Sequence, residues 1–233
     1  MPRNDGRNDD ELRPVSFSLG VQRGPAGSVM ITQGGTVVLC AATVQDKVPG
    51  WLAGKGSGWV TAEYSMLPGS VNDRAPRRQG GRDHEIQRLI GRSLRAGVDM
   101  KLLGERLITI DCDVIQADAG TRVASITGGW LALRLAVNRL MEQGLITVDP
   151  IVGQIAAVSV AVVDNRPVLD PVYEEDVRAE VDANFVMTGD GRLVEVQSTA
   201  EGALFTRATL DRMLDLASRG ISTLVALQNA QLA

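Results

Sequence analysis

The sequence is poor in aromatic residues, histidine and cysteine, and each shortage excludes a class of function. Its 233 residues include three tryptophans, three phenylalanines and two tyrosines, too few for an extended base-stacking platform. A single histidine, His84, excludes a zinc site built from several histidines. The two cysteines, Cys40 and Cys112, lie in apolar strand patterns. We therefore predict buried thiols rather than a disulfide or a metal-binding pair.

Long apolar runs are also missing. No stretch of about 18 apolar residues is present, so no membrane span is predicted. The polar lead-in over residues 1–14 has no apolar core of a secretory signal, and we expect a cytoplasmic protein. Because the net charge is −4, contact with a polyanion must depend on a local basic patch. The length allows one large domain or two packed halves, and we predict one domain over residues 1–233 after this lead-in.

The clearest local signal is a strand followed directly by a helix. Apolar and polar residues alternate over 108–114, which predicts a strand with one buried face. A helical pattern follows over 123–141, and Gly144 is suited to end it. The loop between them, residues 117–122, would therefore lie at a helix N-terminus, where backbone N–H groups lack partners.

The end of this loop has the chemistry of an anion site. A helix N-terminus attracts anions through its free N–H groups and its dipole. Gly120 allows close approach to the backbone, Thr121 adds a hydroxyl donor, and Arg122 adds a planar cation suited to phosphate. We interpret the loop as a pocket for inorganic or nucleotide phosphate. The alternative is an ordinary strand-to-helix connection with a surface arginine, since short motifs often match by chance.

The remaining patterns predict an α+β protein with two packed layers. The unbroken apolar run 155–163 predicts a strand buried on both faces, hence a sheet covered by helices. Two similar hairpin patterns, each followed by helices, suggest an internally duplicated fold. Strands are predicted at 15–19, 28–44 (a hairpin at Gly34-Gly35), 59–64 and 184–197 (a hairpin at 189–191), and helices at 84–98 (capped by Asp83), 206–220 (closed by Gly220) and 221–232.

Arginines are concentrated between residues 74 and 95. Several follow one another along one face of the predicted helix 84–98, beside its apolar stripe. Such a cluster suits a polyanion track, and a solvated charged face is the alternative. The cluster comprises Arg74, Arg77, Arg78, Arg82, Arg88, Arg92 and Arg95.

An acidic segment, residues 173–182, contains a second candidate group. Asp176 and Asp182 would diverge by about 120° on a helix, but could converge in an extended or irregular segment. Converging carboxylates can hold a divalent metal or supply a proton to a leaving oxygen. A solvated acidic loop is the alternative.

Taken together, motifs spread over nearly the whole chain resemble the ribonuclease PH family of bacterial phosphorolytic exoribonucleases. The resemblance implies a duplicated β-α unit like the second domain of ribosomal protein S5, assembled as a homo-hexamer (a trimer of dimers). The motifs are DGRNDDELRPV, GSGWVTAEYSMLP, GGRDHEIQRLIGRSLRAGVD, IDCDVIQADAGTRVASITGG, YEEDVRAEVDANFVM and VEVQSTAEG.

The resemblance also implies an activity and its residues. The family removes 3′-terminal nucleotides from RNA, notably tRNA precursors, as nucleoside diphosphates, with inorganic phosphate as co-substrate and Mg²⁺ as the metal. The reaction is reversible as nucleotidyl transfer. Matched by motif, the implied residues are Arg82, Gly120, Thr121 and Arg122 for phosphate, Asp176 and Asp182 for catalysis and metal binding, and Arg74, Arg77 and Arg78, with Arg88 and Arg92 from the arginine pattern, for RNA or ring contacts.

The chain departs from the family pattern at three places. Ala119 and Ser198 stand where the family usually has glycine, and the segment 67–80 is several residues short. We expect the first to affect the backbone of the phosphate loop, and the last to affect ring assembly or the grip on tRNA. A non-catalytic RNA-binding subunit of an exosome-like ring is the alternative function. A small-molecule phosphate-transfer enzyme is a weaker one, because no GxxxxGK loop is present.

Overall fold

The computed structural model describes residues 3, 5–77, 79–202 and 204–233, which form two sheets and four helices. The first sheet has the order β1-β2-β3-β5-β4, in which only the β4–β5 pair is parallel. The predicted alternation is confirmed, because Ile108, Ile110, Cys112 and Val114 are buried. The strands are β1 (Val15–Leu19), β2 (Gly27–Gln33), β3 (Thr36–Gln45), β4 (Trp59–Met66) and β5 (Leu107–Gln116).

The second sheet has the order β7-β6-β8-β9 and is antiparallel. Every residue of β6 is buried, as its unbroken apolar run predicted. Ile155 and Ala157 belong to the core on one face, and Ala156 and Val158 to the core on the other. The elements of this half are β6 (Ile155–Val163), β7 (Arg166–Leu169), α3 (Tyr173–Asp176), β8 (Val181–Thr188), β9 (Leu193–Ala200) and α4 (Arg207–Leu232).

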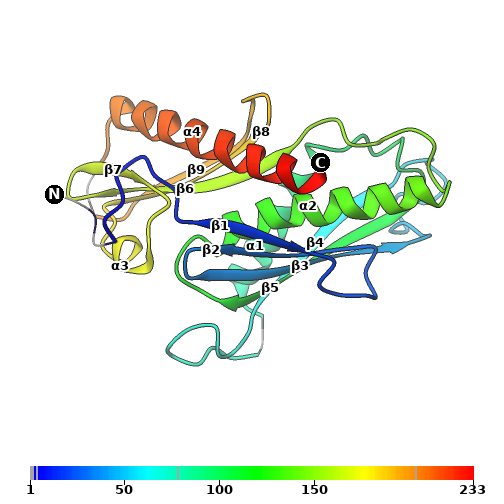
Figure 1. The fold of residues 1–233 in the computed structure, drawn as a ribbon, viewed down its shortest axis with the longest axis horizontal. Coiled ribbons are helices and arrows are strands. Elements are labelled where there is room, and N and C mark those ends of the chain that lie inside the picture. Colours follow the sequence, from blue (N-terminus) through cyan, green and yellow to red (C-terminus); the bar gives the residue numbers. More distant parts are fainter. Residues whose placement is uncertain (1–2, 4, 78, 203) are drawn as a thin grey trace.

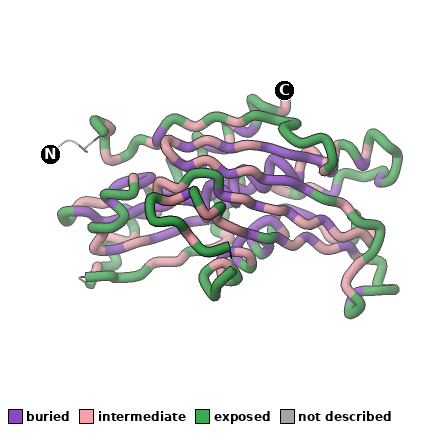
Figure 2. The backbone as a smooth tube through the Cα atoms, turned by 90° about the horizontal axis from the view of Figure 1, so that it is seen from below, coloured by how far each residue is buried: buried purple, intermediate pink, exposed green. Residues whose placement is uncertain are grey.

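Helix α2 (Thr121–Glu142) lies between the two sheets (Figure 1). It packs on β2 and β3 on one side and on β6 on the other, and α1 (Gly81–Arg95) lies beside it against β4. Helix α4 covers the outer face of the second sheet. The layers are therefore sheet, helices, sheet and helix, rather than the two layers predicted. In Figure 2 the buried backbone follows the strands through the interior, while exposed turns lie at their ends.

The helix boundaries predicted at Asp83 and at Gly220 are wrong. Asp83 is not the N-cap of α1. The helix begins at Gly81, and the Asp83 carboxylate accepts a hydrogen bond of 2.7 Å from the Gly80 N–H. Helix α4 continues through Gly220 instead of ending there, and close packing explains why this position is a glycine. A Cβ atom at Gly220 would lie 3.0 Å from the side chain of Leu169.

Both cysteines are buried, as predicted, and their sulfur atoms lie 4.0 Å apart. Among the helices of the described residues, none has the length and apolar character needed to cross a membrane.

Candidate active site

The turn between β5 and α2 places the start of a buried helix at the surface of the molecule. Ala119 and Gly120 both have positive φ angles, of 55° and 66°, so the chain reverses sharply before Thr121. Helix α2 begins at Thr121, two residues earlier than predicted, which puts Thr121 and Arg122 in its first turn. The N–H groups of a first turn have no acceptor within the helix, so this turn can bind an anion.

Ala119 is strained in this turn, since a left-handed conformation costs a residue with a Cβ about 1–2 kcal/mol. We predict that Ala119→Gly raises the free energy of unfolding by about 0.5–1 kcal/mol, after the greater chain entropy of glycine is counted. Thermal unfolding measures this change. Ala124→Gly, three residues into α2, is the matched control and should destabilise the protein by about 1 kcal/mol or more. A lower melting temperature for Ala119→Gly would contradict the prediction.

The Thr121 hydroxyl is oriented by a buried tyrosine. The Tyr64 hydroxyl, on β4, lies 2.8 Å from Thr121 Oγ1, and Tyr64 is 1% exposed. Burial raises the pKa of Tyr64, which keeps its phenol protonated at neutral pH. When the phenol donates to Oγ1, the Thr121 proton is free to point at a bound anion.

This arrangement predicts the effect of Tyr64→Phe, which removes one hydroxyl and no other atom. We expect the KM for phosphate to rise about 3- to 10-fold, the loss of roughly one hydrogen bond, with little change in the KM for RNA. Steady-state kinetics with phosphate varied at saturating RNA measures it. Thr121→Ser retains the hydroxyl and should stay within about threefold of the wild type. An unchanged KM for phosphate in Tyr64→Phe would show that Thr121 needs no orienting partner.

Two arginines approach the turn from different helices. Arg122 is partly buried, and its guanidinium lies 3.5 Å from the Glu85 carboxylate of α1 and 3.4 Å from Gln197 Oε1 of β9. Arg82 is exposed in the first turn of α1. Burial raises the pKa of the Asp176 carboxyl, and the charges of both arginines oppose that rise.

The two aspartates predicted for catalysis lie in this same electrostatic neighbourhood. Asp176 is the last residue of α3, and Asp182 is the second residue of β8. Burial raises the pKa of both carboxyl groups. The charge of Asp176 raises the pKa of Asp182 further, while Arg122 and Arg82 oppose the shift. By exposed surface Asp176 is exposed and Asp182 is partly buried, and the charges of Arg82 and Arg122 act on both carboxyl groups.

Comparisons of the chain with known proteins identify one family. Residues 11–137 match the model described as 3′ exoribonuclease family, domain 1, and residues 153–220 match domain 2 of the same family. The chain belongs to the 3′ exoribonuclease family. It is 55% identical to Ribonuclease PH of Roseobacter denitrificans over 98% of each chain. It is also 57% identical to Ribonuclease PH of Saccharopolyspora erythraea, over 100% of this chain and 95% of the other.

Solved structures agree with the fold. Rice Rrp46 has a TM-score of 0.83 and 18% identity, covering 99% of each chain. The structure described as the Archaeoglobus fulgidus exosome with RNA bound to the active site has a TM-score of 0.81 and 22% identity, covering 97% of this chain and 92% of the other. At this identity the likeness shows the fold alone. The family match confirms the predicted ribonuclease PH fold and the predicted phosphorolytic 3′-to-5′ exoribonuclease activity.

The arginines predicted for RNA or ring contacts, three from the family resemblance and two from the arginine pattern, differ in their surroundings. Arg74 and Arg77 are exposed in the loop 67–80, and Arg88 is exposed on α1. Arg92 makes two hydrogen bonds of 2.7 Å to Glu195 of β9, which raise its pKa and tie α1 to the second sheet. The remaining residue of the prediction, Arg78, lies outside the described residues.

The predicted metal ligands remain a pair. Over the described ranges, no group of three or more histidine, cysteine, aspartate or glutamate residues could hold a metal ion. Asp176 and Asp182 would therefore offer two carboxylates as ligands. This number suits Mg²⁺, which is commonly bound by one or two carboxylates together with substrate phosphates and water.

Sequence reasoning missed the N-terminal segment, which was predicted as a polar lead-in only. Arg3 and Arg13 are 5% and 4% exposed, and each forms buried ion pairs with residues next to the acidic segment. Their partners are Glu175 and Asp170. The family motif DGRNDDELRPV was the available signal, because it marks this segment as more than a linker.

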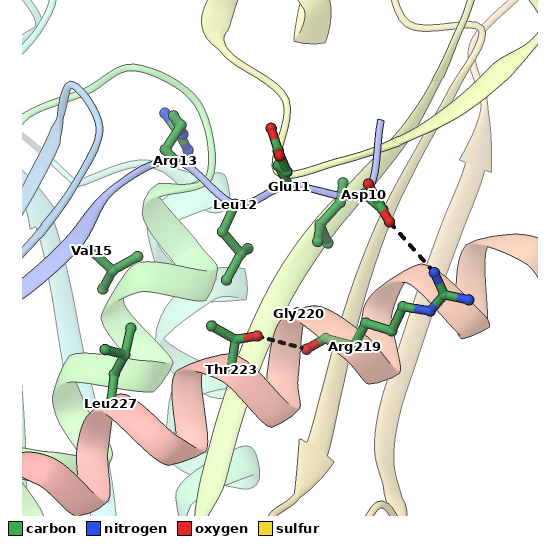
Figure 3. Close-up of a pocket in the computed structure, with 10 residues that line it drawn as sticks. Asp10, Glu11, Leu12, Arg13, Val15, Arg219, Gly220, Thr223 and Leu227 are labelled. Carbon is green, nitrogen blue, oxygen red and sulfur yellow. Dashed lines mark hydrogen bonds and ion pairs between the residues drawn. The ribbon is translucent and has the colours of Figure 1, made fainter. Parts of the chain in front are cut away.

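The same segment also lines a cavity of about 360 Å³ against α4 (Figure 3). Leu12 points into it opposite Thr223, and the Arg13 side chain is directed away from α4. None of the predicted site residues lines this cavity. The candidate active site is therefore the open turn at the start of α2, not this pocket.

Proposed function

We propose that this family member performs its phosphorolysis at the start of α2, using the six residues assigned from the sequence. The observation that carries the proposal is electrostatic. Burial raises the pKa of the Asp176 and Asp182 carboxyl groups, and Arg82 and Arg122 both oppose that rise, although the four residues belong to four elements, α1, α2, α3 and β8. A phosphate held by the arginines would therefore lie near the aspartates.

The physical obstacle to the reaction is the repulsion between inorganic phosphate and the RNA phosphodiester. Arg122 and Arg82 neutralise the attacking phosphate, and the Thr121 hydroxyl and the first-turn N–H groups orient it. An oxygen of this phosphate bonds to the terminal phosphorus atom of the RNA, and the bond from phosphorus to the preceding 3′ oxygen breaks. The 3′ oxygen takes a proton, and a nucleoside diphosphate leaves. Because an ester is exchanged for an anhydride, the reaction also runs in reverse.

Asp176 and Asp182 act on the departing 3′ oxygen and the terminal linkage. Burial and the charge of Asp176 raise the pKa of Asp182, which favours a proton or a bound cation at this carboxyl, so the pair suits both proton donation and a divalent metal. We propose that the two carboxylates hold Mg²⁺ when it is bound, which would neutralise charge developing on the linkage. Titration of Mg²⁺ against an EDTA-treated enzyme tests this assignment.

We propose precursor tRNA 3′ ends as the substrate, a homo-hexamer as the assembly and the cytoplasm as the location. Support for a ring comes from the structural neighbours, two of which are exosome cores. The short 67–80 loop makes the assembly worth measuring, and native mass measurement would distinguish a hexamer from a dimer. The alternative of a non-catalytic ring subunit is disfavoured, because the Gly120-Thr121-Arg122 turn and both aspartates are retained.

The decisive experiment supplies a short RNA with and without inorganic phosphate and identifies the mononucleotide released. We expect nucleoside diphosphates only when phosphate is present, and extension of the RNA when nucleoside diphosphate is in excess. Monophosphates released without phosphate would show hydrolysis and reject the proposal. Binding of RNA without any product would favour the non-catalytic alternative.

A further inference from the structure

Asp118, the residue before the left-handed turn, contacts both parts of the proposed site. Its Oδ1 accepts a hydrogen bond of 3.0 Å from the N–H of Tyr173, the first residue of α3. Its own N–H donates to Thr36 Oγ1 at 2.9 Å, and Thr36 in turn donates to the Ala119 carbonyl at 2.6 Å. One side chain thus joins the phosphate-binding turn to the helix that ends in Asp176.

Arg13 contacts both Asp118 and the segment that leads into α3. Its guanidinium donates to the Asp118 carbonyl and lies 3.3 Å from the Asp118 carboxylate. The same guanidinium pairs with the fully buried Asp170 at 2.7 Å. Asp170 lies three residues before α3, and burial of its carboxyl is outweighed by Arg13, so its pKa is lowered. Arg13 is therefore a common anchor for the turn and for the segment that leads into α3.

Helix α3 depends on such contacts because it has only four residues. A helix of one turn is not stable by itself in water. A second contact that stabilises α3 comes from Glu175. Its carboxylate pairs with Arg3 at 2.6 Å and accepts a hydrogen bond of 3.1 Å from the Val172 N–H. These contacts fix α3 to the N-terminal segment, whereas the contact from Asp118 to Tyr173 fixes it to the phosphate-binding turn.

We propose that Asp118 is a positioning residue, which holds Asp176 at a fixed separation from the phosphate bound at the start of α2. The proposal rests on the proposed function of these residues. The role proposed for Asp118 is to hold α3, and it requires no contact between Asp118 and the substrate. Its loss would let α3 shift relative to the turn, and displacements of about 1 Å at a reacting centre can cost on the order of 100-fold in rate.

The test compares Asp118→Ala and Asp118→Asn with the wild type. Phosphate is varied at saturating RNA, so that kcat and the KM for phosphate are obtained separately. We expect kcat/KM for phosphate to fall on the order of 100-fold in Asp118→Ala, with both parameters changed and the KM for RNA unchanged. Asp118→Asn should recover part of the loss, because its amide oxygen can still accept from the Tyr173 N–H. If Asp118→Ala does not fold, the asparagine variant carries the test.

Asp149→Ala is the matched control. Asp149 also accepts a backbone N–H, from Ile151 at 2.9 Å, and pairs with an arginine, Arg134 at 2.7 Å, but it follows the far end of α2. This variant should keep wild-type kinetics. A loss in Asp118→Ala that equals its loss of folded protein, with an unchanged KM for phosphate, would reduce Asp118 to a structural residue and overturn the proposal.

Hydrogen exchange separates this inference from the proposed function. Without its acceptor, the Tyr173 amide should exchange faster in Asp118→Ala than in the wild type or in Asp149→Ala, whatever the activity. Unchanged exchange over residues 171–177 would overturn the proposal. A wild-type protein that lacks phosphorolysis would instead reject the proposed function, and the exchange result would still decide whether Asp118 holds α3.

Discussion

Asp182→Ala should abolish phosphorolysis while the protein still binds phosphate. We expect kcat to fall on the order of 1,000-fold, within the range for removal of a positioned acid–base group. The reason is that Asp182 is a partly buried carboxyl on which the charges of Asp176, Arg122 and Arg82 act, and its removal takes away the proposed acid–base group. Single-turnover assays measure the loss, and stabilisation of the variant by added phosphate against heat reports retained binding. A variant with more than a tenth of wild-type kcat would remove Asp182 from the reaction.

Asp182 should also make the free energy of unfolding depend on pH, in a direction that follows from its raised pKa. Burial and Asp176 raise the pKa of Asp182 in the folded state, so its ionised form is disfavoured there. This penalty is complete above the folded pKa, shrinks as the pH falls through it, and is absent below the unfolded pKa of about 3.9. Asp182→Asn should therefore be more stable than the wild type near pH 8, by about 0.5–2 kcal/mol, and equal to it near pH 3.5. Asp190→Asn is the control. Its fully exposed carboxyl has a pKa lowered to about 2, chiefly by a hydrogen bond from Arg192, and should give no such gain.

Arg122→Ala should raise the KM for phosphate about 10- to 100-fold, because a charge-assisted contact to phosphate contributes about 1.5–3 kcal/mol. Arg122→Lys should recover only part of this loss, since lysine keeps the charge without the planar fork. Arg134→Ala is the matched control. It lies on the same helix and also pairs with a carboxylate, but that partner, Asp149, is remote from the turn. Equal phosphate kinetics in Arg122→Ala and Arg134→Ala would place the phosphate elsewhere.

Much of the fold could be predicted because its signals are local. The alternation over β5 and the unbroken run of β6 state directly which faces are buried, and the structure agrees. The phosphate turn was predictable for the same reason, since Gly120, Thr121 and Arg122 are consecutive. Its conformation extends one residue further, to the left-handed Ala119, where the family usually has glycine.

What could not be predicted depends on contacts between distant residues. Arg13 is separated from Asp118 and Asp170 by more than 100 positions, and no local pattern pairs them. A glycine often marks the end of a helix, but α4 continues through Gly220, which is required there because Leu169 occupies the space of a Cβ. Asp176 and Asp182 were predicted to converge only on the condition of an irregular segment, and a one-turn helix followed by a strand meets that condition.

The position of α2 has a consequence for how the chain can be divided. The family models split it after residue 137, but the helix that ends the first part packs against β6 of the second. Expressed alone, residues 1–150 would leave Thr127 and Trp130 without their hydrogen-bond partners Ala157 and Gly153, and residues 151–233 would expose one side of β6. We infer that neither fragment is an autonomous folding unit, and that mixing the two would restore structure only by complementation.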